Sequence, residues 1–356
     1  MKITIIGGGN IGTLMAGEMA AKGHAVTVYT SKPDRWSHTI HVLDPDGKEL
    51  VSGKLTNITS DLSEAMNGAE LIWVTMPAQM FGGLGKQMEQ YIVAGQMVGV
   101  VPGGGGAEFA FKGLIDKGAV LFGLQRVHSI ARLEKYGKSV HMLGRKSKLE
   151  LGSIPADNAV RISEIVEGLF DIPCVPLANY LCVTLTPSNP ILHTTRLCTM
   201  FKDYKDGVIY IRNFLFYEEW NNASSQLLLD CDAELQKLCD VIPLELKAVE
   251  SLRIYYESET AEAMTKKISG INAFKGLTSP MVEVKDGWIP DFDSRYFTTD
   301  FPFGLKIIKD LAMVYNVETP NIDFVWNWYK NFDQKHANNA IDLTSYKKDE
   351  FEMLYR

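Results

Sequence analysis

The distribution of apolar and polar positions divides the chain into two halves of different character. In the first half, short apolar runs that predict strands alternate with segments of helical periodicity. The strand-like runs cover residues 2–6, 24–30, 71–77, 97–106 and 119–125, and helical segments lie at 13–23 and 79–91. Strands that alternate with helices are typical of a parallel sheet covered by helices on both faces.

One segment of the first half has a different pattern. Residues 38–56 contain two strand-like runs on either side of the turn Pro45-Asp46-Gly47. A turn of this composition between two extended runs predicts a β-hairpin. We expect this hairpin to be inserted at the edge of the sheet.

Beyond about residue 185, strand-like runs disappear and helical periods dominate. Leu228, Cys231, Leu235 and Leu238 share one face of a predicted helix. Further helices are expected at 189–204, 244–257, 259–268, 304–315 and 321–332. The sequence therefore predicts an α/β fold: an N-terminal Rossmann-type doubly wound sheet in residues 1–185, followed by a mostly α-helical second domain in residues 186–356.

The composition narrows the functional class. A chain of 356 residues with 46% hydrophobic and 22% charged residues is expected to form two globular domains. Its 36 basic and 43 acidic residues give a net charge of −7 without a basic stripe, which argues against a nucleic-acid partner. No apolar run reaches the ~20 residues needed to span a bilayer, so no membrane partner is expected.

Cysteine usage and the first residues bear on the compartment. The five cysteines are an odd number without a CxxC pair, so no metal site or disulfide framework is predicted. Reduced thiols are typical of cytosolic proteins. The chain opens with a strand rather than with a signal peptide. We therefore expect a soluble cytoplasmic protein.

Gly7, Gly9 and Gly12 form a G-x-G-x-x-G motif that follows the first strand and opens the first helix. In dinucleotide-binding domains the first glycine permits the tight turn, the second permits close approach of the pyrophosphate, and the third permits close packing of helix and strand. Asn10 and Ile11 inside the motif, and Pro77 after the third strand, complete the expected cofactor site. The alternative is a glycine turn with a structural role only.

The end of the second strand indicates which nicotinamide cofactor binds. An NAD site usually has Asp or Glu at this position to bind the ribose 2′-hydroxyl, whereas Thr30 and Ser31 stand here. Lys32 and Arg35 follow and would suit a 2′-phosphate, although Asp34 between them is counter-evidence and both cations could belong to an ordinary solvated loop. We predict NADP(H), and NAD is retained as the alternative.

A candidate acid/base lies in the stretch TPSNPILHTTR, residues 186–196. A lone histidine beside apolar residues, such as His193, is more often structural than catalytic. His193 nevertheless follows the change of domain character, where substrates commonly bind and where it could face the nicotinamide. A carboxylate in the segment 294–305 could hold its imidazole and fix its tautomer.

These elements together resemble the opine dehydrogenases, the octopine/nopaline dehydrogenase group. The N-terminal unit, SNPILH (188–193) and RYFTTDFPFGL (295–305) carry the resemblance, which extends from about residue 2 to about 330. It implies that His193 is the catalytic acid/base and that Asp300 pairs with it. Thr299 departs from the family, which often has an acidic residue at that position.

The resemblance also implies a reaction. The amino group of an amino acid would condense with the carbonyl of a 2-oxo acid such as pyruvate, and NAD(P)H would reduce the resulting imine. The predicted substrate contacts are Gln125, Arg132 and Asn189. Of these, Arg132 is the best candidate for a substrate carboxylate, because an arginine can bind one through two parallel hydrogen bonds. The segment 125–132 lacks the family's Leu-Pro-Trp-like residues, and Gln125 and Arg132 could equally be surface or interface residues. His128, within it, is a second candidate histidine.

Two other functions remain open. A ketopantoate reductase or related 2-oxo/hydroxy acid dehydrogenase has a similar architecture, but it relies on a lysine early in the helical domain, and residues 149–201 contain none. A sensor that binds NADP(H) without chemistry would not need a histidine–aspartate pair. The aromatic cluster Trp326, Trp328 and Tyr329 could belong to a homodimer interface or, more often, to the core.

Overall fold

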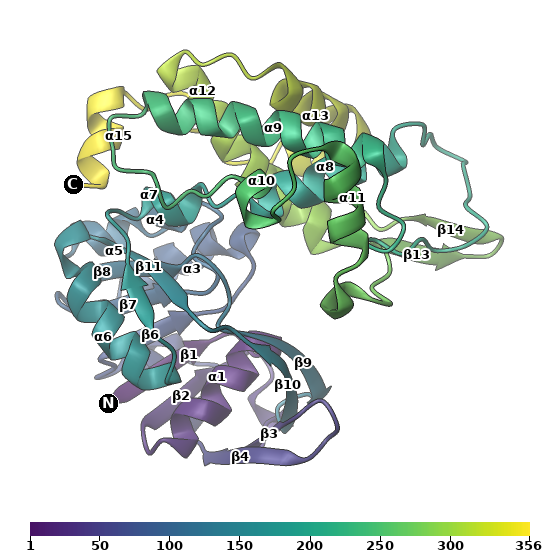
Figure 1. Cartoon of the computed structure of the whole chain (residues 1–356). Coiled ribbons are helices and arrows are strands. Elements are labelled where there is room, and N and C mark those ends of the chain that lie inside the picture. The colour runs from purple at the N-terminus through teal and green to yellow at the C-terminus, as the bar shows by residue number, and fades with distance from the viewer. The chain divides into compact units, whose positions relative to one another are not determined.

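The computed structural model describes residues 1–356, which form two compact units (Figure 1). The first unit consists of Met1–Thr184 together with Glu352–Arg356, and the second of Leu185–Phe351. The expected boundary lay one residue later, and the expected second domain included the last five residues, which group here with the first unit. None of the helices has both the length and the apolar composition that a membrane span needs.

The first unit is built on an eight-stranded sheet with the strand order β12-β11-β8-β7-β6-β1-β2-β5. The strands are β1 (Lys2–Ile6), β2 (Ala25–Tyr29), β5 (Asn57–Thr59), β6 (Leu71–Val74), β7 (Met97–Val100), β8 (Val120–Leu124), β11 (Leu149–Ile154) and β12 (Cys174–Pro176). The predicted doubly wound fold is confirmed. The sheet is mixed rather than fully parallel, because β11 pairs antiparallel with β8.

Helices connect these strands. They are α1 (Asn10–Ala21), α2 (Leu62–Met66), α3 (Phe81–Met88), α4 (Ala107–Ala110), α5 (Lys112–Asp116), α6 (Ala159–Phe170) and α7 (Leu181–Thr184), with short 3-10 turns η1 (Pro33–Arg35), η2 (Ala78–Met80) and η3 (Ala156–Asn158). Every residue of β6 and β7 is buried, as expected of central strands covered on both faces.

A second, four-stranded sheet corrects the prediction for the hairpin. β3 (Thr39–Leu43) and β4 (Glu49–Lys54) pair antiparallel as expected, but they continue into β10 (Ser139–Arg145) and β9 (Ser129–Lys135) rather than into the edge of the main sheet. The register of Ser139 with His41 joins segments almost 100 residues apart. A local sequence pattern contains no information on such a long-range pairing.

Helix α1 packs against both sheets of the first unit. Its residues from Gly12 to Met19 are all buried, and most of them are apolar or small, as expected of a helix covered on more than one face. Close packing requires small residues: a Cβ at Gly53 in β4 would lie 2.3 Å from the carbonyl oxygen of Gly17 in α1. Because α1 packs against both sheets, the position of the glycine turn at its start is fixed.

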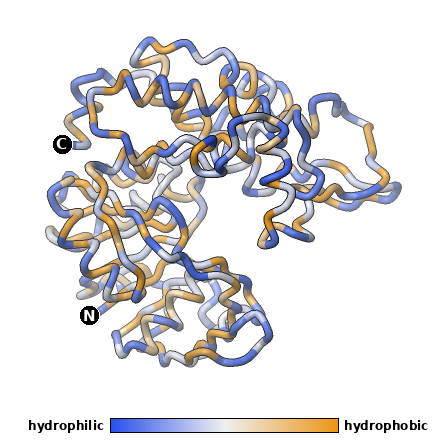
Figure 2. Tube along the Cα trace, viewed as in Figure 1, coloured by the Kyte–Doolittle hydropathy of each residue, from blue (hydrophilic) through white to orange (hydrophobic).

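The second unit is mostly helical. Its elements are η4 (Ser188–His193), α8 (Thr194–Phe201), α9 (Asn222–Val241), α10 (Leu252–Tyr255), α11 (Ala261–Ser269), η5 (Asn272–Phe274), η6 (Tyr296–Leu305), α12 (Lys306–Tyr315), α13 (Pro320–Phe332), α14 (Gln334–Ala337) and α15 (Lys348–Leu354). η4 and η6 are π-helical. Hydrophobic and hydrophilic residues alternate along these helices in Figure 2, as expected when each buries one face.

Two expectations for this half were wrong. Residues 244–257 form a helix only over the four residues of α10, since the segment before it is irregular. Strands are also present, because β13 (Met281–Val284) and β14 (Gly287–Pro290) form a hairpin. The Asp286-Gly287 dipeptide is a common hairpin-turn signal that could have revealed it.

The late aromatic cluster belongs to the core of the second unit. Trp326 and Tyr329 are 4% and 0% exposed, and the Tyr329 ring stacks on Phe301 with centroids 4.2 Å apart. Trp328 stacks on Phe332 at 4.5 Å. These contacts favour the core interpretation over the interface interpretation.

Candidate active site

The glycine turn has the geometry that a dinucleotide requires. Gly7 has a φ of +116°, which residues with a Cβ rarely adopt. A Cβ at Gly12 would lie 1.9 Å from the carbonyl oxygen of Gly7, so only glycine fits where the helix meets the turn. A Cβ at Gly9 would meet no atom within 4 Å. The turn thus packs tightly against its own backbone at Gly12 and leaves free space at Gly9. This free space at the N-terminus of α1 fits a pyrophosphate.

The other residues predicted to contact the cofactor differ in their burial and in their contacts. The side chain of Asn10 accepts a hydrogen bond of 2.9 Å from the backbone N–H of Leu133 and so ties α1 to β9. Ile11 packs against the core clusters on both sides of α1. Pro77 is exposed at the start of η2.

The residues after β2 surround Tyr136, which lies just after β9. The hydroxyl of buried Thr30 is 3.1 Å from the hydroxyl of Tyr136. The Arg35 guanidinium lies 5.0 Å from the centroid of the same ring. Ser31, Lys32 and Arg35 are exposed, and neither cation forms an ion pair. Both charges therefore remain available to a phosphate.

In the second unit, His193 and Asp300 are adjacent although 107 residues separate them. The Nδ1 atom of His193 is 2.8 Å from Oδ2 of Asp300, and the two residues are 6% and 7% exposed. A carboxylate can only accept, so Nδ1 carries the proton and donates it to Asp300. This leaves Nε2 as the basic nitrogen of the neutral ring.

The two π-helical segments explain how these side chains meet. His193 ends η4, and Asp300 lies in the middle of η6. The segments pack through small and rigid residues: a Cβ at Gly304 in η6 would lie 3.1 Å from the Pro190 ring in η4. π-Helical turns often occur at functional sites. Pro190 of the Asn-Pro sequence and Gly304 of the Pro-Phe-Gly sequence therefore lie in the contact between the two irregular helices that carry the pair.

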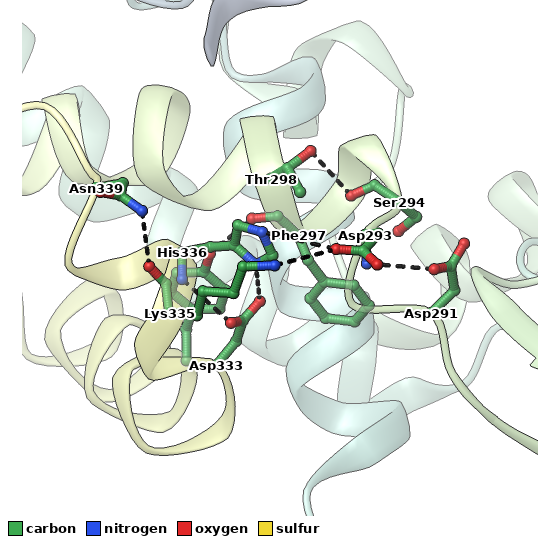
Figure 3. A network of polar contacts seen from close by, with 10 residues as sticks. Asp291, Asp293, Ser294, Phe297, Thr298, Asp333, Lys335, His336 and Asn339 are labelled. Atoms are coloured by element: carbon green, nitrogen blue, oxygen red, sulfur yellow. Dashed lines mark hydrogen bonds and ion pairs between the residues drawn. The ribbon is translucent and has the colours of Figure 1, made fainter.

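A network of polar contacts holds the start of η6 (Figure 3). Within it, Thr298 donates to the carbonyl of Ser294 at 3.1 Å, and Lys335 lies 3.5 Å from the Asp293 carboxylate. The network contains a second histidine–aspartate pair, in which Nδ1 of His336 is 2.7 Å from Asp333. Asp333 also caps α14. This pair thus has a local structural role and serves as a comparison for the first.

Known protein families match the two halves of the chain separately. Residues 176–332 match the model described as "NAD/NADP octopine/nopaline dehydrogenase, alpha-helical domain", and residues 2–132 match "NAD-dependent glycerol-3-phosphate dehydrogenase N-terminus". The octopine dehydrogenase of Mizuhopecten yessoensis is 25% identical over 92% of this chain and 89% of its own length. The opine dehydrogenase of Haliotis discus hannai is 28% identical over the same shares.

The chain is similar to the opine dehydrogenases over most of its length. It is accordingly an NAD(P)-dependent oxidoreductase. The fold agrees: an octopine dehydrogenase solved with NADH and L-arginine superimposes with a TM-score of 0.83 and 23% identity, covering 99% of this chain and 96% of the other. The resemblance seen in the SNPILH and RYFTTDFPFGL elements is confirmed.

The three predicted substrate contacts occupy different surroundings. Gln125 is 6% exposed, and its amide donates to the carbonyl of Cys182 at 2.8 Å, which gives it a structural bond. Arg132 is exposed on β9, where it donates to the carbonyl of Ala131 at 2.9 Å. Asn189 is exposed in η4. Their roles in substrate binding stay predictions.

The second candidate histidine is a core residue. His128 is 0% exposed, its Nε2 is 2.8 Å from Glu18, and its ring stacks on Phe170 with centroids 4.3 Å apart. Glu18 also binds Arg145 at 2.8 Å. The ring therefore belongs to a buried network between α1 and the small sheet.

Sequence reasoning missed two residues beside His193. The hydroxyl of Tyr217 is 3.0 Å from Nε2 of His193, and burial raises the pKa of this phenol well above its usual range. Arg295 is exposed, forms no ion pair, and lies 5.8 Å from the centroid of Tyr296, whose ring is in turn 4.7 Å from that of His193. Arg295 was visible in the RYFTTD element, whereas no motif marks Tyr217.

A buried arginine positions Tyr217. Arg196, in the helix that follows His193, donates to the carbonyls of Phe216 at 3.0 Å and Glu219 at 2.8 Å. Burial lowers its pKa to about 10, so the guanidinium stays protonated at neutral pH. The same helix therefore carries the imidazole and holds the backbone on both sides of the tyrosine.

Proposed function

We propose that this chain joins the amino group of an amino acid to the carbonyl of a 2-oxo acid such as pyruvate and reduces the product with NADPH in preference to NADH. The observation that carries the proposal is the buried His193–Asp300 pair, in a domain that matches the octopine/nopaline dehydrogenase model. Octopine dehydrogenase structures with NADH and L-arginine, and with NADH and pyruvate, support the two substrate classes.

The roles of the pair follow from its geometry. Asp300 accepts the Nδ1 proton, holds the ring in one tautomer and stabilises the imidazolium. Nε2 exchanges protons as the amino group attacks the carbonyl and water leaves. Histidine is the side chain most often used for such proton exchange, because its ring can both accept and donate a proton. When bound, NAD(P)H supplies the hydride that reduces the imine carbon.

Both substrates carry a carboxylate, and the second unit offers a cation for it. Arg295 is exposed beside Tyr296 and has no acidic partner. A guanidinium binds a carboxylate through two parallel hydrogen bonds, which fixes its orientation as well as its position. We assign Arg295 to a substrate carboxylate, as a candidate in addition to the predicted contacts Gln125, Arg132 and Asn189.

The decisive experiment is a matrix of amino acids against 2-oxo acids, in which the absorbance of NADPH or NADH is followed. The expected result is cofactor consumption that requires both substrates. Consumption with the oxo acid alone would favour a hydroxy acid dehydrogenase of the ketopantoate reductase type. Tight cofactor binding without turnover on any combination would favour the sensor.

The cofactor preference is tested at the exposed cations after β2. Replacing Lys32 and Arg35 by alanine removes the two charges available to a 2′-phosphate. We expect KM for NADPH to rise about tenfold or more, because charged hydrogen bonds contribute roughly 1.5–3 kcal/mol, with KM for NADH little changed. Equal effects on both cofactors would contradict the NADP assignment.

The cysteines support a proposal for the compartment. All five are free thiols, and Cys174, Cys182, Cys198 and Cys231 are buried. A chain without disulfides is suited to the reducing cytoplasm, which we propose as its location.

A further inference from the structure

The basic nitrogen of the His193–Asp300 pair already has a hydrogen-bond partner. Nδ1 binds Asp300 at 2.8 Å, and Nε2 accepts the hydroxyl of Tyr217 at 3.0 Å. Tyr217 is itself 6% exposed. A proton that moves between Nε2 and a substrate must therefore pass through this hydroxyl, or the tyrosine must first move away.

The surroundings of Tyr217 oppose such a movement. Its ring stacks on Phe274 with centroids 4.1 Å apart and an interplanar angle of 20°, and it lies nearly parallel to Trp220, at 7°. The backbone on both sides is held by Arg196. Displacing the hydroxyl would break aromatic contacts on the ring and strain the bonds to a buried guanidinium.

We propose that Tyr217 is a catalytic residue of the reaction given under Proposed function, and that its hydroxyl carries the proton between His193 and the substrate oxygen. While the imidazole is neutral, the hydroxyl donates to Nε2. When the ring is protonated, Nε2–H donates to the tyrosine oxygen instead, and the phenol hydrogen turns to the substrate. One hydroxyl can both donate and accept, so the two bonds exist together.

The loss of water from the amino acid–oxo acid adduct illustrates how the protons and charges are conserved in this step. The phenol proton passes to the adduct hydroxyl as the Nε2 proton passes to the tyrosine oxygen. The carbon–oxygen bond breaks and water leaves, while the nitrogen lone pair forms the carbon–nitrogen double bond. The adduct becomes an iminium ion, imidazolium becomes imidazole, and tyrosine is unchanged.

Burial keeps the tyrosine in the protonated form that this step needs. Removal of the phenol from water raises its pKa far above neutrality, nearby Tyr296, Tyr256 and Asp300 raise it further, and Arg295 opposes them. The hydroxyl is thus a donor throughout the working range, and only the imidazole changes its charge.

The test is Tyr217→Phe, which keeps the stacked ring and removes the hydroxyl. We expect kcat of the two-substrate reaction to fall roughly 10²-fold, the usual size of a proton-transfer contribution, with KM for both substrates nearly unchanged. The matched control is Tyr329→Phe, another buried hydroxyl, which donates to the carbonyl of Phe297 at 2.6 Å. The control should lower the melting temperature and keep kcat.

A second series separates a relay from a structural hydrogen bond, even if Tyr217→Phe does not fold. Fluorotyrosines of graded acidity at position 217 keep the ring and the hydroxyl. A relay predicts that kcat and its pH profile change steadily with phenol acidity. A kcat independent of acidity, or a Tyr217→Phe enzyme with wild-type kcat, would overturn the inference.

The outcome for Tyr217 is distinct from the outcome for the proposed function. Failure of the proposed function appears in the wild type, as cofactor consumption that does not need the amino acid. Failure of the relay appears in the variants, as normal turnover by an enzyme whose wild type does require both substrates.

Discussion

At the scale of single residues, His193 and His336 show why a histidine–aspartate contact does not by itself define an acid/base. In both rings Nδ1 donates to an aspartate carboxylate, over 2.8 Å in His193 and 2.7 Å in His336. In His336, the other nitrogen lies 4.0 Å from the carboxylate of Asp293. In His193, it faces the neutral hydroxyl of Tyr217, which can both donate and accept. These surroundings favour His193 over His336 as the proposed acid/base.

This difference gives a matched pair of variants. His193→Ala should lower turnover roughly 10²-fold or more while cofactor affinity stays nearly constant, because the imidazole is assigned to proton transfer. His336→Ala should keep turnover, because its pair caps α14. Steady-state rates combined with cofactor titration measure both effects. A His193→Ala enzyme with near-normal turnover would exclude the assignment.

The residue types at this site were predictable in part. His193 and Asp300 were selected from two short elements that resemble a family. Arg295 lies in the second of these elements but was given no role. Tyr217 stands in the stretch FLFYEEW without a motif, and only the packing of the second unit brings it to Nε2. Gln125 was selected because it follows the strand after which the family places substrate-facing residues. Its amide donates to the carbonyl of Cys182 inside the first unit, and its role in substrate binding stays a prediction.

At the scale of elements, the glycine turn before α1 separates two physical requirements. Gly12 is required by packing, since a Cβ there would overlap the Gly7 carbonyl at 1.9 Å. Gly9 is free of such neighbours, since a Cβ there would meet nothing within 4 Å. A requirement for glycine at position 9 can therefore come only from what binds against the turn.

Alanine substitutions at these two positions test the distinction. Gly12→Ala should destabilise the first unit, lower its melting temperature and abolish cofactor binding, because the helix must move away from the turn. Gly9→Ala should keep the melting temperature and weaken NAD(P)H binding, because the added methyl stands where the pyrophosphate approaches. Calorimetry and fluorescence titration distinguish them. Unchanged cofactor affinity in Gly9→Ala would place the dinucleotide elsewhere.

Element prediction succeeded where the signal is local. The β1–α1–β2 unit follows from an apolar strand, a glycine turn and a helix stop at Gly23, whose φ is +83°. The hairpin of β3 and β4 also followed from its turn. Its sheet partners did not, because β9 and β10 lie far along the chain and their pairing depends on packing over α1.

At the scale of the whole molecule, Glu108 joins three distant stretches of the first unit. It is fully buried in α4, and its Oε1 atom accepts from Thr184 at 2.5 Å and from Tyr355 at 2.8 Å. Its Oε2 atom has no hydrogen-bond partner. Burial raises the pKa of the carboxyl from 4.5 to about 7, against the opposing hydrogen bonds of Thr184 and Tyr355. The last residues of the chain are thus anchored on a carboxyl that prefers to be neutral.

A pH-dependent stability follows. Between about pH 4.5 and about 7 the folded chain holds a proton on Glu108 that the unfolded chain releases, so this contribution to stability falls as the pH rises through that window. Glu108→Gln removes the titration. Its melting temperature should therefore increase relative to wild type between pH 5 and pH 8.

The control for this prediction is Glu164→Gln, at an exposed position of α6. Its melting temperature should keep a constant difference from wild type over the same range. A constant difference for Glu108→Gln as well would mean that Glu108 has the same protonation in the folded and unfolded chains.

The sequence alone determined those properties that depend on neighbouring residues. Backbone torsions at a glycine turn, the alternation of strands and helices, and the composition of two short elements are all set within about ten positions, so they revealed the fold class, the cofactor and the reaction family. The tertiary structure decided which side chains share a hydrogen bond. His193 with Tyr217, Glu108 with Tyr355, and β3 with β10 are pairs separated by 24 to 247 residues. Packing brings such pairs together, and these long-range contacts cannot be inferred from a local pattern of apolar and polar residues.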